Sequence, residues 1–382
     1  MFHRYLPAPS SSIFLLGPRG TGKSTWIHQN FPEAPLYDLL NTRESLRLSK
    51  DPAQLFQELA VVAAESWVVI DEIQKVPALL DEVHRLIEKK SLTFVLCGSS
   101  ARKLKQSGVN LLAGRARSME MFPLVSAEVN DQLALDRVCS YGMLPVAYTD
   151  PEPQTYLRSY AETYLQEEIK AEALTRDIGG FARFLEVASR QNGQVTNVSN
   201  ISRDALVARQ TVQGFFDILC DTLIGFWLKA WKLKRATKQL AHPKFYFFDS
   251  GVARALSGRL PYPPSPEETG PLFETFIINE IRAYLSYSKL HYPIFFWSSP
   301  EGVEVDLFCE TQKGFVALEI KSTSRWDVKF NKGLNRIADE LGKKKILRFG
   351  VYAGDRPARL GDITLLPFQE FLKRLWSGEI LS

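Results

Sequence analysis

The sequence predicts an α/β fold in three parts, with a parallel sheet in the first part and a smaller α/β domain in the last. Short apolar runs alternate with helical stretches up to about residue 150, and charged helical periodicity follows. One helix and several strands in quick succession come after that. With 382 residues, 45% hydrophobic and 24% charged, the chain is long enough for two or three domains with sizeable cores.

The first element is an apolar run of strand length, residues 12–16, followed by a glycine-rich loop and a helix. The loop and the first helical residues are Gly17, Pro18, Arg19, Gly20, Thr21, Gly22, Lys23, Ser24 and Thr25. They fill every required position of the phosphate-binding loop G-x-x-x-x-G-K-[ST]. Backbone N–H groups and the helix N-terminus attract phosphate oxygens, Lys23 reaches the β- and γ-phosphates, and Ser24 ligates Mg²⁺. We therefore predict that this segment binds ATP with Mg²⁺.

A second motif consists of four apolar residues followed by two acids, at residues 67–72. This pattern is typical of a buried parallel strand with carboxylates at its C-terminal end, where ligands bind in open α/β sheets. We expect Asp71 to hold Mg²⁺, directly or through water, and Glu72 to orient or deprotonate the attacking water. The adjacent acid favours ATP hydrolysis over phosphate transfer to a second substrate.

The first part continues with a predicted helix at 76–90 and a buried strand at 92–97, which ends in Gly98, Ser99 and Ser100. Ser99 or Ser100 contacts the γ-phosphate or the attacking water, or else caps the next helix. Arg115 is placed to act as an arginine finger on the nucleotide of a neighbouring subunit. The alternatives are that Arg115 lies on the surface or packs against the phosphate-binding loop, or that Arg117 takes the finger role.

Several segments together resemble one group of prokaryotic AAA-superfamily ATPases, over the whole length of the chain. They are GPRGTGKST at 17–25, IDEIQKVPALL at 70–80, LCGSS at 96–100, LLAGRARSMEMFPLVSAE at 111–128, YGMLP at 141–145, PKFYFFDSG at 243–251, VEVD at 303–306 and EIK at 319–321. Members of that group typically carry a C-terminal domain related to restriction endonucleases. The resemblance also implies ATP sites formed between subunits, and hence a homo-oligomer, either a ring or an open assembly.

The middle of the chain is predicted to be helical, with helices at 154–173 and 179–190 forming a lid. A short helix at 203–209, a turn and a second helix at 211–219 fit a winged-helix module, which the resemblance also implies. From residue 196 to 244, eight Lys or Arg stand against three Asp, and bases alternate with apolar residues at 229–235. This alternation fits a β-wing that binds a DNA backbone, or a solvated strand edge protected by lysines.

The last part follows a Pro-, Gly- and Ser-rich segment at 257–270, which is predicted to be a linker. A helix at 272–287, strands at 294–297, 303–309 and 315–322, another helix and a strand at 346–352 follow the order of a restriction-endonuclease core. We predict a carboxylate cluster for Mg²⁺ made of Glu274, Asp306 and Glu319, with Lys321 stabilising the attacking hydroxide. The alternative is a Glu–Lys pair on a solvated sheet face, and cleavage itself stays open.

The four cysteines form no close pair, which fits a reducing compartment, and no signal peptide is visible. The longest apolar stretch, at 215–228, is interrupted by Asp217 and Asp221 and is too short to span a bilayer. The formal net charge is +4.

We therefore expect a cytoplasmic Mg²⁺-dependent AAA-type ATPase with domains at 1–150, 151–256 and 271–382. It would bind DNA and couple ATP hydrolysis to DNA remodelling or translocation, with possible cleavage. The alternatives are a nucleotide-gated switch that binds a protein partner, and a nuclease effector gated by ATP.

Overall fold

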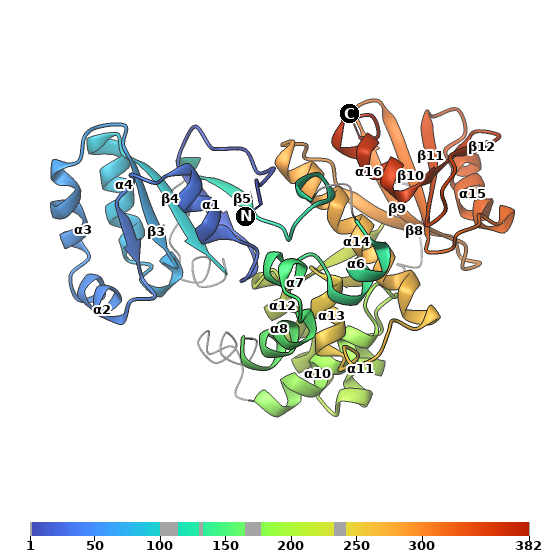
Figure 1. The fold of residues 1–382 in the computed structure, drawn as a ribbon, viewed down its shortest axis with the longest axis horizontal. Helices are drawn as coiled ribbons and strands as arrows, with labels where there is room; N and C mark the ends of the chain where they lie inside the picture. Colours follow the sequence, from blue (N-terminus) through green and yellow to red (C-terminus); the bar gives the residue numbers. More distant parts are fainter. Residues whose placement is uncertain (1, 100–113, 130–132, 165–176, 233–241, 382) are drawn as a thin grey trace. The chain divides into compact units, whose positions relative to one another are not determined.

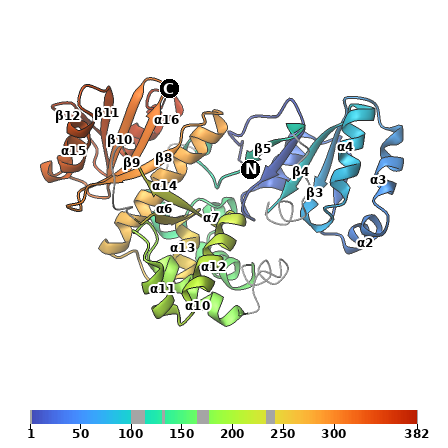
Figure 2. The same cartoon turned by 180° about the vertical axis from the view of Figure 1, so that it is seen from behind.

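The computed structural model describes residues 2–99, 114–129, 133–164, 177–232 and 242–381. The chain divides into two compact units. One consists of Leu6–Pro123 and Asp221–Ile224, and the other of Met1–Tyr5, Leu124–Cys220 and Gly225–Ser382. Figure 1 labels the elements of both units, and Figure 2 shows them from behind. Ser100, and Lys234 and Arg235 of the segment predicted to be a β-wing, lie outside the described residues.

The first unit contains, in its described part, a parallel sheet of five strands in the order β2-β3-β4-β1-β5. The strands are β1 (Ile13–Leu16), β2 (Leu36–Asp38), β3 (Trp67–Asp71), β4 (Thr93–Gly98) and β5 (Arg117–Glu120). Three of the predicted apolar runs are thus confirmed as strands. Because β4 lies between β1 and β3, the segments that follow these three strands meet at one edge of the sheet.

The helices of this unit include α4, which lies along the sheet beside β3 and β4 (Figures 1 and 2). Its buried Val83 and Leu86 share a core with Phe14, Ile70 and Phe94 of the sheet. The predicted helix at 76–90 begins later than expected, since a 3₁₀ turn precedes it. The helices are α1 (Lys23–Asn30), α2 (Thr42–Lys50), α3 (Ala53–Glu58) and α4 (Leu79–Lys90), with the 3₁₀ turns η1 (Leu59–Val61) and η2 (Ile73–Lys75).

The second unit begins with a helical part. Its elements are η4 (Ser126–Glu128), α6 (Leu135–Tyr141), α7 (Pro145–Thr149), α8 (Pro153–Ser159), the π-helical η5 (Tyr160–Tyr164), α10 (Ile178–Arg190), α11 (Val198–Ala205), α12 (Arg209–Asp221) and α13 (Ser250–Leu256). The helix predicted at 203–209 was wrong in position, because α11 begins five residues earlier. The Asn197 side chain accepts hydrogen bonds from Ser199 N and Asn200 N and so fixes the start of α11.

Asp249 connects two of the segments that carry the family resemblance, YGMLP at 141–145 and PKFYFFDSG at 243–251. Its carboxylate is buried, accepts from Val252 N at 3.0 Å as the cap of α13, and accepts from Met143 N at 2.6 Å. The segments around Met143 and Asp249 therefore hold each other in place. Burial raises the pKa of Asp249 to about 6, although these backbone donors oppose the shift.

The sheet of the second unit has eight strands in its described part, in the order β12-β13-β11-β10-β9-β8-β6-β7. They are β6 (Gly225–Ala230), β7 (Lys244–Phe247), β8 (Ile294–Ser298), β9 (Glu304–Thr311), β10 (Gly314–Lys321), β11 (Ile346–Tyr352), β12 (Ala358–Leu360) and β13 (Ile363–Pro367). The three strands predicted in succession, β8, β9 and β10, pair antiparallel. The structure adds that β11 lies parallel to β10.

One pairing in this sheet was not predicted. The hairpin β6–β7 joins the C-terminal strands because β6 pairs in parallel with β8, with Lys229 opposite Phe295. The segments predicted as separate domains at 151–256 and 271–382 consequently belong to one compact unit, which also takes in residues 124–150.

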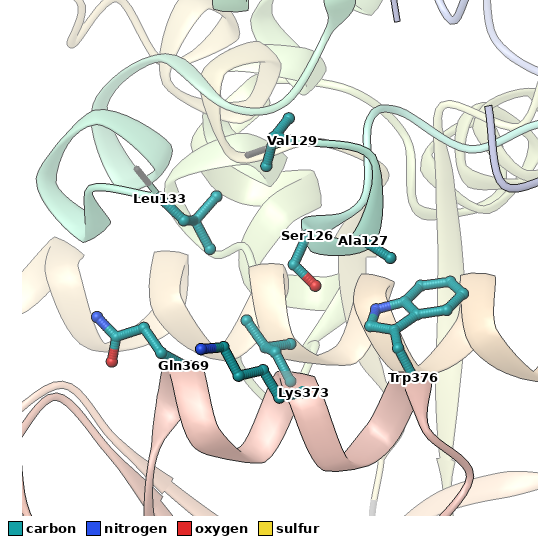
Figure 3. Close-up of a pocket in the computed structure, with 8 residues that line it drawn as sticks. Ser126, Ala127, Val129, Leu133, Gln369, Lys373 and Trp376 are labelled. Carbon is teal, nitrogen blue, oxygen red and sulfur yellow. The ribbon is translucent and has the colours of Figure 1, made fainter. Parts of the chain in front are cut away.

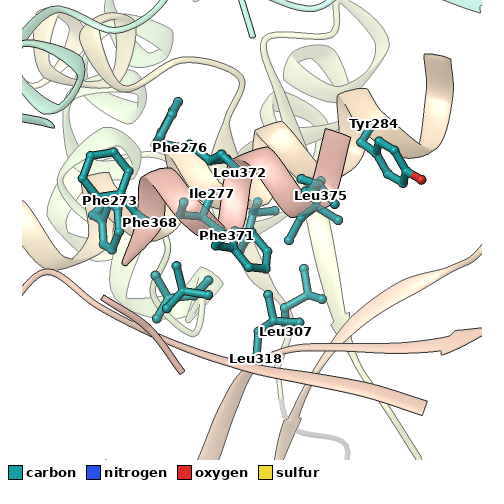
Figure 4. Close-up of a cluster of buried hydrophobic side chains, with 14 of the residues drawn as sticks. Phe273, Phe276, Ile277, Tyr284, Leu307, Leu318, Phe368, Phe371, Leu372 and Leu375 are labelled. Atoms are coloured by element: carbon teal, nitrogen blue, oxygen red, sulfur yellow. The ribbon is translucent and has the colours of Figure 1, made fainter. Parts of the chain in front are cut away.

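Helices cover both faces of this sheet. The helices α14 (Pro266–Tyr287) and α16 (Phe368–Trp376) lie on one face, and η6 (Val328–Phe330) and α15 (Asn331–Leu341) lie on the other. Figure 4 shows Ile277, Phe371 and Leu375 packed over Leu307 and Leu318.

The start of α14 falls within the predicted linker. Ser265 and Glu268 form a capping box at its N-terminus, and Pro266 takes the first helical position. The linker therefore ends well before residue 270.

A pocket of about 540 Å³ lies beside α16 (Figure 3). It is lined by Ser126, Ala127, Val129, Leu133, Gln369, Leu372, Lys373 and Trp376. Next to it the buried Glu280 carboxylate accepts hydrogen bonds from Ser126 N, Ser126 Oγ and Trp376 Nε1. Burial raises the pKa of Glu280 to about 7.

In the part of the chain that the structure describes, no helix has the length and apolar character needed to cross a membrane.

Candidate nucleotide site and acidic cluster

The predicted phosphate-binding loop joins β1 to α1, as the sequence indicates. Gly22 has φ 92°, a left-handed conformation that favours glycine, immediately before the first residue of α1. The buried Lys23 donates from Nζ to Gly17 O at 2.6 Å and to Pro18 O at 3.0 Å, and Thr21 Oγ1 donates to Pro18 O at 2.8 Å. The loop is thus held in a curled form by its own side chains, while Arg19, Ser24 and Thr25 are exposed.

The two acids lie at the same edge of the sheet as this loop. Asp71 ends β3, and its Oδ2 atom is 3.5 Å from Ser24 Oγ. A hydroxyl and a carboxylate at this separation are oxygen donors of the kind that Mg²⁺ takes beside a nucleotide phosphate. Ser24 and Asp71 therefore fit the predicted metal role. Glu72 follows with φ 57°, a left-handed conformation that is uncommon outside glycine and concentrates at functional sites.

The structure adds Gln74 to this site, a residue that the sequence analysis did not single out. Gln74 is buried, and its Nε2 atom donates to the Glu72 carboxylate and to Ser99 Oγ, the latter at 3.4 Å. A Cβ atom on Gly98 would lie 2.4 Å from Gln74 Oε1, so the glycine leaves the room that Gln74 occupies. Ser99, which is also buried, is therefore linked to Glu72 through one amide group.

We expect Gln74→Leu to lower the ATP turnover number by about tenfold with little change in ATP affinity. The reason is that Glu72 loses a donor worth roughly 1.5–3 kcal/mol, as is usual for a hydrogen bond to a charged group. Steady-state hydrolysis together with equilibrium nucleotide binding checks this. The exposed Gln57→Leu is the matched control. A loss of affinity equal to the loss of turnover would place Gln74 in nucleotide binding instead.

Arg115 lies near the N-terminal end of strand β1, opposite the end that leads into the phosphate-binding loop. It comes two residues before β5, whose first residue, Arg117, pairs with the first residue of β1. The phosphate loop follows the last residue of β1, so Arg115 is remote from the loop of its own chain. Arg115 donates to Glu88 on α4. A finger role for Arg115 therefore requires a second chain.

The four residues of the predicted acidic cluster do come together in the second unit. Glu319 and Lys321 lie on β10, Asp306 on β9 and Glu274 on α14. Lys321 Nζ is 2.6 Å from Glu319 Oε1 and 3.1 Å from Asp306 Oδ2. Asp306 Oδ2 also accepts from Ile320 N at 2.7 Å. These contacts show a buried cluster, so the alternative of a Glu–Lys pair on a solvated sheet face does not describe it.

Three residues of this cluster were missed, Glu304 on β9 and two residues on β7. Lys244 and Tyr246 lie two apart on β7, so they share one face of the strand. Lys244 Nζ lies 3.3 Å from Glu274 Oε1, and the Tyr246 hydroxyl donates to the same oxygen. Their spacing in the segment KFYFFD was visible in the sequence, but the contact with a helix thirty residues away was not.

Burial shapes the electrostatics of the cluster. It raises the pKa of Glu274 and of Glu319, and in both cases the nearby Asp306 carboxylate adds to the increase. Burial opposes the charged form of Lys321, but Asp306 and Glu319 outweigh it and raise the pKa of Lys321. Lys321 therefore stays an ammonium group between two carboxylates.

The three predicted metal ligands do not by themselves form a metal cage. Within the described ranges, no group of three or more His, Cys, Asp or Glu side chains is arranged to hold a metal ion. The physical reason is that Lys321 and Lys244 lie among these carboxylates. One acceptor does stay open, because the buried Glu319 Oε2 has no hydrogen-bond partner in the described part of the chain. Asp306 and Glu319 thus fit an Mg²⁺ ion held by two carboxylates and substrate phosphate, and Glu274 does not.

Comparison with protein families divides the chain into three stretches. Residues 10–130 match a family described as "AAA domain", and the parallel sheet of this stretch agrees with such a domain. This match supports ATPase activity. Residues 132–262 match "Domain of unknown function (DUF8612)", and residues 269–371 match "Domain of unknown function (DUF4143)".

Individual relatives are distant. Uncharacterized proteins of Mycobacterium bovis and Mycobacterium tuberculosis are each 25% identical over 97% of this chain and 83% of their own length. An uncharacterized protein of Haemophilus influenzae is 25% identical over 55% of this chain and 58% of its own length. Among solved structures, a signal-transduction ATPase with a tetratricopeptide repeat sensor from Pyrococcus horikoshii aligns with TM-score 0.20 and 12% identity, over 74% of this chain and 46% of that one.

Proposed function

We propose that the protein is an Mg²⁺-dependent AAA-type ATPase that binds DNA and couples ATP hydrolysis to remodelling of, or movement on, DNA. The observation that supports it most is the meeting of three segments at one sheet edge: the loop with Lys23 and Ser24, the acids Asp71 and Glu72, and Ser99. The part of the proposal that concerns DNA rests on the second unit. We propose that this unit contains a winged-helix module and a restriction-endonuclease-like domain.

The roles of the nucleotide-site residues follow from their positions. The loop N–H groups and Lys23 bind the phosphates, and Ser24 and Asp71 would hold Mg²⁺, which when bound draws charge from the phosphate oxygens. Glu72 accepts a proton from the attacking water, or orients it, at the edge of the sheet. Gln74 donates to the Glu72 carboxylate and to Ser99 Oγ, and Ser99 would contact the γ-phosphate.

The winged-helix proposal rests on the order of elements in the middle of the chain. Helices α10, α11 and α12 are followed by the hairpin β6–β7, and Val195 pairs with Lys244 as an added bridge to that hairpin. Lys229 and Lys232, at the end of β6 and just beyond it, are both exposed. Exposed cations in this place suit contacts with a phosphate backbone.

The face of the second unit that carries α15 adds further cations, and Lys329 lies over the same Phe330 ring as Lys321 of the acidic cluster. Lys332 and Arg336 are exposed and four residues apart on α15, while Leu334 and Ile337 of the same helix pack on the sheet. Exposed Arg325 and Lys329 lie in the segment between Lys321 and α15. A backbone bound along this face would pass close to Asp306 and Lys321.

DNA binding is tested by its dependence on salt. Lys229→Ala combined with Lys232→Ala should weaken binding to every sequence equally. If both lysines contact duplex phosphates, the salt slope of log affinity should shrink by roughly 2 units. Fluorescence anisotropy across a salt series measures this, with the exposed pair Lys50→Ala and Lys89→Ala as the control.

The coupling of the two units is tested by measuring the ATPase rate with and without single-stranded, duplex and branched DNA. We expect at least one form to raise turnover in the wild type, and the rise to be smaller in the Lys229 and Lys232 double variant. Binding without stimulation would oppose coupling. Neither binding nor stimulation would favour the alternative, a nucleotide-gated switch that binds a protein partner.

Metal-dependent cleavage of DNA is a separate part of the proposal. Asp306 and Glu319 would hold Mg²⁺, which when bound activates a water molecule for attack on a phosphodiester. Lys321 then lies within reach of the charge that develops on the phosphate, since its ammonium group is already between those two carboxylates. Unlike Lys229 and Lys232, these residues bear on one scissile phosphate and not on the length of the backbone.

A further inference from the structure

The acidic cluster contains a second buried ammonium group, Lys244, for which the reaction proposed above has no use. Lys244 is 4% exposed. Its Nζ atom is 3.3 Å from Glu274 Oε1 and 3.3 Å from Glu304 Oε2. The Tyr246 hydroxyl donates to the same Glu274 oxygen, and Tyr246 is fully buried. Strand β7 therefore holds a carboxylate of α14 and one of β9.

The two lysines of the cluster are placed alike. Lys244 lies between Glu274 and Glu304, just as Lys321 lies between Asp306 and Glu319. The six side chains joined by these ion pairs are four carboxylates and two ammonium groups. When all six are ionised, the four carboxylates exceed the two ammonium groups by two negative charges, and one divalent cation supplies that amount of positive charge. The Glu304 side chain is 36% exposed, whereas those of Glu274, Asp306 and Glu319 are each 13% exposed or less.

The open acceptor of the cluster lies on the side of Lys321. Glu319 is 7% exposed, and its Oε2 atom has no hydrogen-bond partner among the described residues. Glu274, by contrast, already accepts from two donors through one oxygen. The half around Asp306 and Glu319 still has an open carboxylate oxygen for a metal ion. In the half around Glu274 and Glu304, the Lys244 ammonium group already occupies the position between the carboxylates.

We propose that Lys244 is a built-in cation that takes the place of a second metal ion, so that the cluster binds one divalent cation on Asp306 and Glu319. Tyr246 fixes Glu274 against Lys244 and keeps that carboxylate out of the metal site. This inference rests on the metal site proposed above, but it concerns the number of ions bound and is independent of whether DNA is cleaved.

The test counts bound Mn²⁺ on the full chain without nucleotide, from the electron paramagnetic resonance signal of the free ion. Only ions whose binding is lost when Asp306→Asn and Glu274→Gln are combined in the same protein are assigned to the cluster, so that an ion in either half is counted. We expect one such ion in the wild type and in Lys244→Arg, which keeps the charge. Lys244→Gln removes the charge but keeps a polar end, and it should bind two. Lys229→Gln makes the same change of charge on the exposed hairpin and should bind one.

The outcomes separate this inference from the metal site on which it depends. One ion in the wild type and one in Lys244→Gln would overturn the role of Lys244 and leave the metal site standing. Two ions in the wild type would do the same. No ion in any variant would overturn both. Circular dichroism confirms folding of each variant, and if Lys244→Gln does not fold, Lys244→Met, which also removes the charge, replaces it and should likewise bind two ions.

Discussion

Replacing Glu72 by Gln should slow ATP hydrolysis by about 10²–10⁴-fold, the usual contribution of a general base, while ATP still binds. The amide cannot accept the proton of the attacking water, whereas Ser24 and Asp71, which would hold Mg²⁺, are unchanged. Single-turnover hydrolysis and equilibrium binding of a fluorescent ATP analogue measure the two effects separately. The exposed Glu33→Gln makes the same chemical change away from the sheet edge and should hydrolyse ATP normally.

Lys23→Ala supplies the contrasting result. It should lose nucleotide binding, because the cation that faces the β- and γ-phosphates is removed. The same change also removes the hydrogen bonds to Gly17 O and Pro18 O that hold the loop. Glu72→Gln is therefore the cleaner test of chemistry. Equal turnover in the wild type and Glu72→Gln would show that another group activates the water.

Replacing Arg115 by Ala should leave ATP binding normal and slow turnover at least about a thousandfold, if Arg115 is a finger that acts on a neighbouring chain. Its remoteness from the loop of its own chain makes this a test of assembly. Mixing Arg115→Ala with Lys23→Ala protein should restore part of the activity, because some interfaces then pair an intact loop with an intact arginine. The recovered rate is measured across mixing ratios.

The control for this experiment is Glu88→Gln, which removes the partner of Arg115 but not the arginine. This variant should keep most of its activity. No recovery at any ratio, with exchange of subunits verified by labelled chains, would favour a packing role for Arg115. It would also direct the search for the finger to Arg117, which is exposed at the start of β5.

The nucleotide-binding part of the fold could be predicted from the sequence because its signals are local. The glycines, Lys23 and Ser24 are consecutive, and the runs that became β1, β3 and β4 are apolar along their length. Gln74 was not predicted, because its contact with Ser99 spans 25 residues and depends on β4 lying beside β3. Nothing in the local sequence distinguishes it from a surface glutamine.

The acidic cluster was predicted in part for the same reason. Glu319 and Lys321 alternate on one strand, so their common face follows from strand geometry. The prediction for Glu274 was incomplete, because Glu274 accepts a hydrogen bond from Lys244, which lies on a hairpin that the sequence had assigned to another domain. The start of α11 at Val198 could have been predicted from the sequence, because Asn197 is a helix-capping residue, but this local signal was overlooked.

The parallel pairing of β6 with β8 determines where the chain can be cut into fragments that fold by themselves. A fragment that begins at Ser265 would keep α14 and the strands from β8 onward, but it would lack the hairpin that covers the edge of β8. Unpaired strand edges recruit other chains, so such a fragment would be prone to aggregate. Its hydrophobic core would also lack Leu228 and Tyr246, which belong to the same buried cluster. The residues that a sequence-based boundary would discard include Lys244 and Tyr246. Dissection of the second unit should therefore begin upstream of β6, so that both strands of the hairpin are retained.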